Sequence, residues 1–156
     1  PYFRRHLGIV FQDFRLIPNM TVYDNVAFAM RVIGAKEKKI SNRVPHVLSR
    51  VGLADKAKCL PNELSGGEQQ RVALARAIVN NADIIIADEP TGNLDPKTSE
   101  IVFNELLSIV KETGLSALIA THNFDLADRM DRKVKLEDGK LLDLRAEKFV
   151  SVENFY

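Results

Sequence analysis

Two short apolar runs separated by a helix-like stretch constrain the fold of this chain more than any other feature. Residues 84–87 are β-branched and apolar, which is typical of a strand buried on both faces of a parallel sheet, and residues 117–121 have the same character. Between them, residues 97–112 carry apolar side chains at helical spacing. A strand, a helix and a second strand predict a βαβ unit with parallel strands, and hence an α/β fold class.

Further elements are predicted on both sides of this unit. Each is indicated by an apolar pattern, a capping residue or a turn residue. They are a strand over residues 7–11, a helix over 22–33 that Thr21 caps and Gly34 ends, a helix over about 36–51 with a late start or a kink at Pro45, a helix over 67–80 with a capping box of Ser65 and Glu68, a short helix over 124–130 capped by Asn123, and a hairpin over 133–144 turning at Asp138 and Gly139.

Composition bounds the class of protein. The 156 residues are 46% hydrophobic and 28% charged, which is enough apolar material for one domain with a real core. With 22 basic against 21 acidic residues, net charge gives no argument for binding nucleic acid or a membrane surface. The single cysteine, Cys59, cannot form an internal disulfide, so a reducing compartment is expected. No apolar run approaches the roughly 20 residues that a membrane span needs.

An acidic pair, Asp88 and Glu89, follows the apolar run at 84–87. Carboxylates at the end of a buried strand are costly unless a cation or a reaction requires them. In P-loop nucleotide hydrolases an aspartate in this position helps to hold Mg²⁺, and a neighbouring glutamate can act on the attacking water. The alternative is a pair of solvated loop carboxylates after a core strand.

A second candidate is the stretch Ser65, Gly66, Gly67 and Glu68. Glycines let the backbone approach a ligand, and the amides at a helix start favour an anion. A capped helix alone would explain Ser65 and Glu68, but it would not explain the two glycines, which weaken a helix start.

Two single residues complete the candidates. His122, at the end of the run 117–121, could hydrogen-bond a terminal phosphate or a water, although a lone histidine is more often structural. Gln12, just past the first apolar run, could contact Mg²⁺ or water, and by itself it would be an ordinary loop residue.

Taken together and in this order, these residues resemble the nucleotide-binding domain of ABC ATPases. Residues 64–68 resemble the family's signature motif, 84–89 resemble Walker B with the glutamate that follows it, and 92–95 resemble the D-loop. Gln12 resembles the Q-loop glutamine and His122 the switch histidine. The resemblance covers about residues 7–144. The residues that flank these motifs are most similar to those of the subgroup of FtsE, LolD and MacB.

The resemblance implies the cofactors ATP and Mg²⁺ and a homodimer that sandwiches ATP. Asp88 and Gln12 would hold the metal, Glu89 would act on the water, and His122 would sense the γ-phosphate. The remaining positions would contact the nucleotide held by the other subunit or link the two sites; they are Ser65, Gly66, Gly67, Glu68 and Asp95.

The resemblance also implies a P-loop NTPase-like fold with a helical subdomain. About residues 13–62 would belong to a helical lobe, 63–144 would carry the signature helix, Walker B, D-loop and switch region, and 145–156 would be a tail. The lobe would dock on an integral membrane subunit, FtsX-like or LolC/E-like, which would place the protein in the cytoplasm on the inner face of the cell membrane. The implied activity is ATP hydrolysis as a motor subunit, with an FtsE-like role in cell division preferred over LolD- or MacB-like lipoprotein release or export.

The sequence departs from the family in one large respect. It contains no Gly-x-x-x-x-Gly-Lys-Ser/Thr loop, because its only Gly-Lys pair, Gly139 and Lys140, is followed by Leu141. We therefore expect an N-terminally truncated piece of an ABC ATPase. A smaller departure is Asn123, where the family usually has aspartate.

Two other functions stay open from the sequence. The chain could be a non-catalytic binding module that uses its helical lobe. It could also belong to a soluble DNA-repair or chromosome-structure ATPase, but there is no coiled-coil insertion between Gln12 and Ser65 and net charge is unremarkable. No direct contact with nucleic acid is therefore expected.

Overall fold

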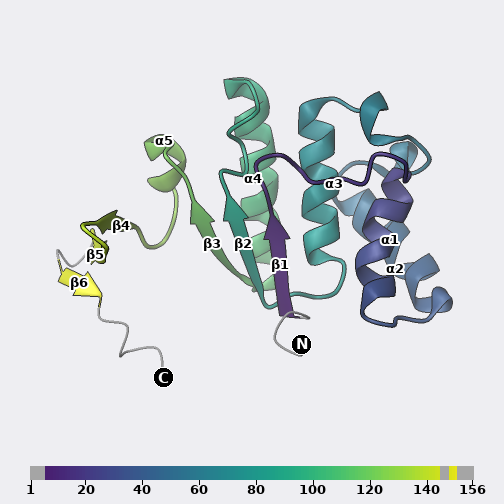
Figure 1. Ribbon diagram of the computed structural model, residues 1–156, viewed down its shortest axis with the longest axis horizontal. Coiled ribbons are helices and arrows are strands. Elements are labelled where there is room, and N and C mark those ends of the chain that lie inside the picture. The colour runs from purple at the N-terminus through teal and green to yellow at the C-terminus, as the bar shows by residue number, and fades with distance from the viewer. Residues whose placement is uncertain (1–5, 145–147, 151–156) are drawn as a thin grey trace. The chain divides into compact units, whose positions relative to one another are not determined.

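The computed structural model describes residues 6–144 and, for the backbone alone, residues 148–150 (Figure 1). The chain divides into two compact units, Pro1–Ala120 and Thr121–Tyr156. Most of the predicted elements, and all the candidate residues except His122, lie in the first unit.

The first unit is built on a parallel sheet of β1 (Leu7–Val10), β2 (Ile84–Asp88) and β3 (Ser116–Ala120), in that spatial order. Val10 lies opposite Ala87, and Ala87 lies opposite Ile119, so the three strands end at the same edge (Figure 1). The predicted βαβ unit and α/β class are confirmed. This edge is where open α/β sheets bind ligands.

The first unit also contains four helices: α1 (Val22–Val32), α2 (Glu37–Arg50), α3 (Gly66–Ile78) and α4 (Pro96–Thr113). The predicted cap at Thr21 is confirmed, since its hydroxyl accepts a hydrogen bond from the Asp24 amide at 3.1 Å. Two short 3-10 turns, Ala54–Lys56 and Pro61–Glu63, connect α2 to α3. The expected late start of α2 is wrong, because the helix begins at Glu37 and continues through Pro45.

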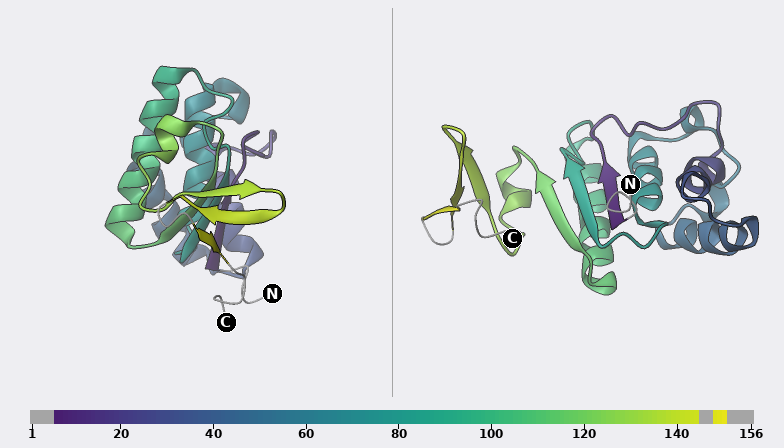
Figure 2. Two further views of the ribbon diagram at one scale, coloured as in Figure 1. Left: turned by 90° about the vertical axis from the view of Figure 1, so that its left-hand side faces the viewer. Right: turned by 60° about the horizontal axis from the view of Figure 1, so that its bottom comes forward.

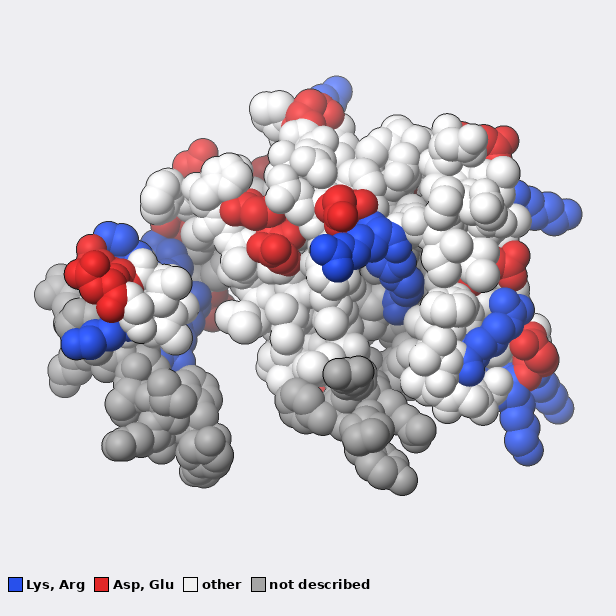
Figure 3. Space-filling model, in the orientation of Figure 1, with Lys and Arg blue, Asp and Glu red and all other residues white. Residues whose placement is uncertain are grey.

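Only one face of the sheet is covered. α4 lies behind the strands in Figure 1, and the side chains of Val10, Ile85 and Ala87 are buried. On the other face Ile9 is 45% exposed and Leu118 is 59% exposed, and Figure 3 shows that the visible surface over the sheet is mostly uncharged. The prediction that β2 and β3 are buried on both faces is therefore wrong for the described residues, which place no helix over this face.

The second unit holds α5 (Phe124–Ala127) and an antiparallel sheet of β4 (Val134–Glu137), β5 (Lys140–Asp143) and β6 (Lys148–Val150) (Figure 2). Asn123 caps α5 as predicted, accepting from the Leu126 amide at 3.2 Å, but the helix is shorter than residues 124–130. The hairpin is also as predicted, with positive φ at both Asp138 and Gly139.

β6 adds a strand inside the predicted tail, while residues 145–147 and 151–156 of that tail lie outside the described part of the chain. Over the described residues, no helix combines the length and apolar character that crossing a membrane would require.

Candidate functional site

Glu89 lies directly after β2, at the carboxyl edge of the sheet, and its backbone is left-handed with φ of 43°. Its amide donates to the carbonyl oxygen of Ala120 at 2.9 Å, and its carbonyl accepts from the Gly92 amide at 3.0 Å. A non-glycine residue held in this region costs about 1–3 kcal/mol, and such strain clusters at functional sites. The half-buried Glu89 is thus fixed in an unfavourable conformation by its neighbours.

Asp88 ends β2 and its side chain is exposed at the same edge. Among the residues that the structure describes, no group of three or more His, Cys, Asp and Glu side chains could hold a metal ion by itself. Mg²⁺ rarely needs such a group, because it binds through one or two carboxylates, water and substrate phosphates. The carboxylate of Asp88 and the amide oxygen of Gln12 are donors that suit this ion.

Gln12 is joined to Asn93 by a reciprocal pair of hydrogen bonds across 81 residues of sequence. The side-chain amide of Gln12 donates to Asn93 Oδ1 at 3.2 Å, and the side-chain amide of Asn93 donates to the Gln12 carbonyl at 2.9 Å. The segment after β1 and the segment after β2 therefore meet over the sheet edge. Asn93 was not singled out from the sequence, where its only signal was membership of the stretch 92–95.

Gly92 lies against the side chains of Gln12 and Glu89. A Cβ atom added at Gly92 would lie 2.8 Å from Gln12 Nε2 and 3.3 Å from Glu89 Cβ. The first distance is shorter than carbon atoms normally allow, so a side chain at position 92 would displace the end of the Gln12 side chain.

The start of α3 carries the predicted capping box. Ser65 Oγ accepts from the Glu68 amide at 3.3 Å, and the Glu68 carboxylate accepts from the Ser65 amide at 2.8 Å and from its hydroxyl at 2.9 Å. The hydrogen bond from the Ser65 amide holds the pKa of Glu68 below its usual value.

The two glycines of α3 also have a packing role. A Cβ at Gly66 would lie 3.1 Å from Leu94 Cδ2, and one at Gly67 would lie 2.5 Å from Thr98 Cγ2. The start of α3 thus packs closely on the segment 94–98, where Asp95 caps α4 by accepting from the Thr98 amide at 3.1 Å. Hydrogen bonds from Thr98 lower the pKa of Asp95. This packing explains the glycines without a ligand, which the sequence pattern alone did not.

His122 belongs to the second unit, where it precedes the Asn123 cap of α5. Its side chain is exposed. Its role at a phosphate stays a prediction, as do the cross-subunit roles of Ser65, Gly66, Gly67, Glu68 and Asp95.

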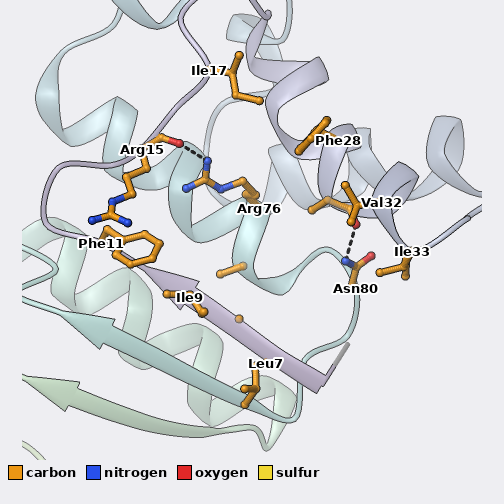
Figure 4. Close-up of a pocket in the computed structure, with 13 residues that line it drawn as sticks. Leu7, Ile9, Phe11, Arg15, Ile17, Phe28, Val32, Ile33, Arg76 and Asn80 are labelled. Carbon is orange, nitrogen blue, oxygen red and sulfur yellow. Dashed lines mark hydrogen bonds between the residues drawn. The ribbon is translucent and has the colours of Figure 1, made fainter. Parts of the chain in front are cut away.

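A groove of about 900 Å³ opens between β1, α1 and α3 (Figure 4). Phe28 and Val32 of α1 are 42% and 68% exposed there, although both are large and apolar. Arg15 lies at the groove with its guanidinium 4.0 Å from the centre of the Phe11 ring. The other apolar side chains that line it include Leu7, Ile9, Ile17 and Ile33.

Comparison with known proteins gives consistent matches. A family model described as "ABC transporter" matches residues 1–92. The chain is 54% identical over 143 residues to the cell division ATP-binding protein FtsE of Mycobacterium tuberculosis, an alignment that covers 91% of this chain and 62% of the relative. It is 50% identical over 141 residues to the lipoprotein-releasing system ATP-binding protein LolD 2 of Rhodopseudomonas palustris, covering 90% of this chain and 61% of the relative. The chain thus spans less than two thirds of the length of these curated relatives.

Proposed function

Because this chain belongs to the ABC transporter family, we propose that it forms part of a motor subunit that binds and hydrolyses ATP. The observation that carries the proposal is the meeting of three distant segments at one sheet edge. Glu89 follows β2, Gln12 is bonded to Asn93, and the start of α3 packs on Leu94. The FtsE and LolD relatives are both ATP-binding proteins by name, which supports the same activity.

Each candidate residue would have a separate role in ATP hydrolysis. Asp88 and Gln12 would hold Mg²⁺, which would neutralise charge that develops on the phosphates. Glu89 would accept a proton from the attacking water, and His122 would hydrogen-bond the terminal phosphate. Two subunits would sandwich ATP, so that Ser65, Gly66, Gly67 and Glu68 approach the nucleotide of the other subunit and Asp95 links the two sites.

These residues account for only part of a nucleotide site. The 156 residues contain no Gly-x-x-x-x-Gly-Lys-Ser/Thr sequence to cradle the phosphates. The test is therefore made on the native full-length protein, by measuring phosphate release from ATP with Mg²⁺ and with excess chelator. Saturable, Mg²⁺-dependent release supports the motor function. No release under any condition, with the protein folded, would favour the non-catalytic binding module.

Gly92→Ala is expected to slow this hydrolysis about tenfold, because the added methyl group displaces the side-chain amide of Gln12. The melting temperature should change little, since Gly92 is exposed and its φ is not in the left-handed region. Phosphate release and thermal unfolding of the two full-length proteins check both points. An unchanged rate would show that the position of Gln12 next to Gly92 does not matter for turnover.

We propose the groove at Phe28 and Val32 as the surface that docks on an integral membrane partner, which would hold the protein at the cytoplasmic face of the membrane. The character of the groove supports this role, because a wide apolar groove with exposed large side chains is typical of a protein interface. An FtsX-like partner and a role in cell division are preferred. A LolC/E-like partner and lipoprotein release are the alternative, since relatives of both names reach 50% identity over about 90% of the chain.

Phe28→Asp is expected to weaken binding to the membrane partner by at least about tenfold, because a charge would be buried in an apolar contact. Ile101→Asp is the matched control, because Ile101 is a 50% exposed apolar residue of α4 that does not line the groove. Co-purification of each full-length variant with the detergent-solubilised partner measures the effect, and the partner's identity decides between the two roles. Equal retention by both variants would contradict docking at the groove.

A further inference from the structure

The segment between β1 and α1 has an unusual backbone for its sequence. Phe14 and Arg15, two successive non-glycine residues, are both left-handed, with φ of 59° and 46°. Side chains with a Cβ rarely adopt this conformation, and two in a row persist only where the surroundings impose it. Within the segment, the Phe14 amide donates to the Phe11 carbonyl at 3.2 Å and the Arg15 amide donates to the Asp13 carbonyl at 2.6 Å. The carbonyls of Phe14 and Arg15 are bonded from outside the segment.

Arg76 of α3 supplies the restraint. Its Nη1 donates to the Arg15 carbonyl at 2.5 Å and its Nη2 donates to the Phe14 carbonyl at 2.8 Å, across 61 and 62 residues of sequence. Figure 4 shows the bond from Arg76 to the Arg15 carbonyl at the groove. The planar fork of a guanidinium suits two adjacent acceptors, whereas the single ammonium of lysine cannot reproduce its geometry.

The segment is also held on both sides of Phe14 and Arg15. Asn93 bonds to Gln12, two residues before Phe14, and the Asn25 side chain accepts from the Ile17 amide at 2.7 Å, two residues after Arg15. Between these points only Arg76 bonds the two left-handed carbonyls among the hydrogen bonds that the described residues make. Release of Arg76 would let Phe14 and Arg15 relax and carry Gln12 with them.

We propose that Arg76 is a positioning residue for Gln12, which acts by clamping the left-handed turn at Phe14 and Arg15 to helix α3. The inference rests on the proposed function only where Gln12 serves ATP hydrolysis. The clamp itself is a property of the fold, and it ties the position of Gln12 to the same helix that begins at Ser65 and Gly66.

A matched control separates positioning from general stability. Arg43 of α2 also uses a half-buried guanidinium to bond backbone carbonyls, donating to Val79 at 3.1 Å and to Ile78 at 3.5 Å. Those carbonyls end α3 and do not belong to the segment that holds Gln12, Phe14 and Arg15. Arg43→Met should therefore disturb the fold in a similar way without releasing Gln12.

The first test is hydrogen exchange in the native full-length protein. The amides of Phe14 and Ile17, which are hydrogen-bonded to Phe11 and Asn25, report on the segment. Arg76→Met is expected to speed their exchange about tenfold, Arg76→Lys less, and Arg43→Met not at all. Unchanged exchange in Arg76→Met would overturn the clamp, and so would equal acceleration in Arg43→Met.

The second test is the hydrolysis of Mg-ATP by the purified subunit. Arg76→Met should lower kcat about tenfold while KM for ATP stays within about twofold, because a displaced Gln12 affects the reacting geometry more than binding. Faster exchange with unchanged kcat would overturn the positioning role. Absence of hydrolysis in the unmodified protein would instead contradict the proposed function, and the exchange result would still decide the clamp.

Discussion

Replacing Glu89 with glutamine in the full-length protein is expected to lower the rate of ATP hydrolysis about 10³-fold, as the loss of a general base typically does. Glutamine has nearly the same shape as glutamate, but its amide cannot accept a proton from water. The backbone bonds that hold residue 89, to Ala120 and Gly92, do not involve the side chain and should persist. Phosphate release under single-turnover conditions measures the effect.

ATP binding should survive this substitution, with an affinity within about threefold of the unmodified protein, because a proton acceptor for water contributes to the transition state and not to the bound nucleotide. Glu100→Gln is the control, since Glu100 is an exposed glutamate of α4. It should leave hydrolysis unchanged. Comparable rates for Glu89→Gln and the control would remove Glu89 from the role of base.

Asn25→Ala is expected to lower the free energy of unfolding by about 3 kcal/mol, because four hydrogen bonds of a buried side chain would be lost at once. Asn25 is only 1% exposed. Its amide nitrogen donates to the carbonyls of Ile17, Met20 and Thr21 at 3.1, 3.0 and 3.1 Å, and its Oδ1 accepts from the Ile17 amide at 2.7 Å. Alanine removes these bonds and creates a small cavity. The carbonyls of Ile17 and Thr21 keep backbone bonds from the amides of Met20 and Asn25, whereas the Ile17 amide and the Met20 carbonyl lose their partner.

Asn42→Ala serves as the control, because Asn42 is an exposed residue within α2 where alanine favours the helix slightly. Chemical denaturation of the full-length protein, followed by circular dichroism, compares the two variants with the unmodified protein. Losses below about 1 kcal/mol for Asn25→Ala would mean that water replaces its hydrogen bonds without penalty. The loop that carries Gln12 would then be less dependent on Asn25 than its contacts indicate.

The sequence predicted the elements well where the signal is local. The Thr21 cap, the Ser65–Glu68 capping box and the Asp138–Gly139 turn each depend on residues within a few positions, and each is as expected. The late start of α2 was predicted from Pro45, because a proline inside a helix is costly in isolation. The helix nevertheless runs through Pro45. The buried residues Ile40, Val44, Val47 and Leu48 on both sides explain why the helix tolerates it.

The candidate site was predictable only in part. Gln12, Asp88 and Glu89 could be placed at one edge because parallel strands end together. Asn25 could have been suspected from its place among the apolar residues Val22 and Val26, where a polar side chain must find partners. Nothing local to Arg76 or Asn93 indicated that they would bond to the segment around Gln12.

By itself, the sequence determined the strand and helix order, the caps and the polar residues at the strand ends, because these follow from interactions between neighbours in the chain. Only the tertiary structure decided which residues hold Gln12, why Gly66 and Gly67 must be small, and that Phe14, Arg15 and Glu89 are left-handed. Each of these depends on atoms that are distant in sequence, and a conformation that is unfavourable locally is stable only when such contacts compensate for its cost.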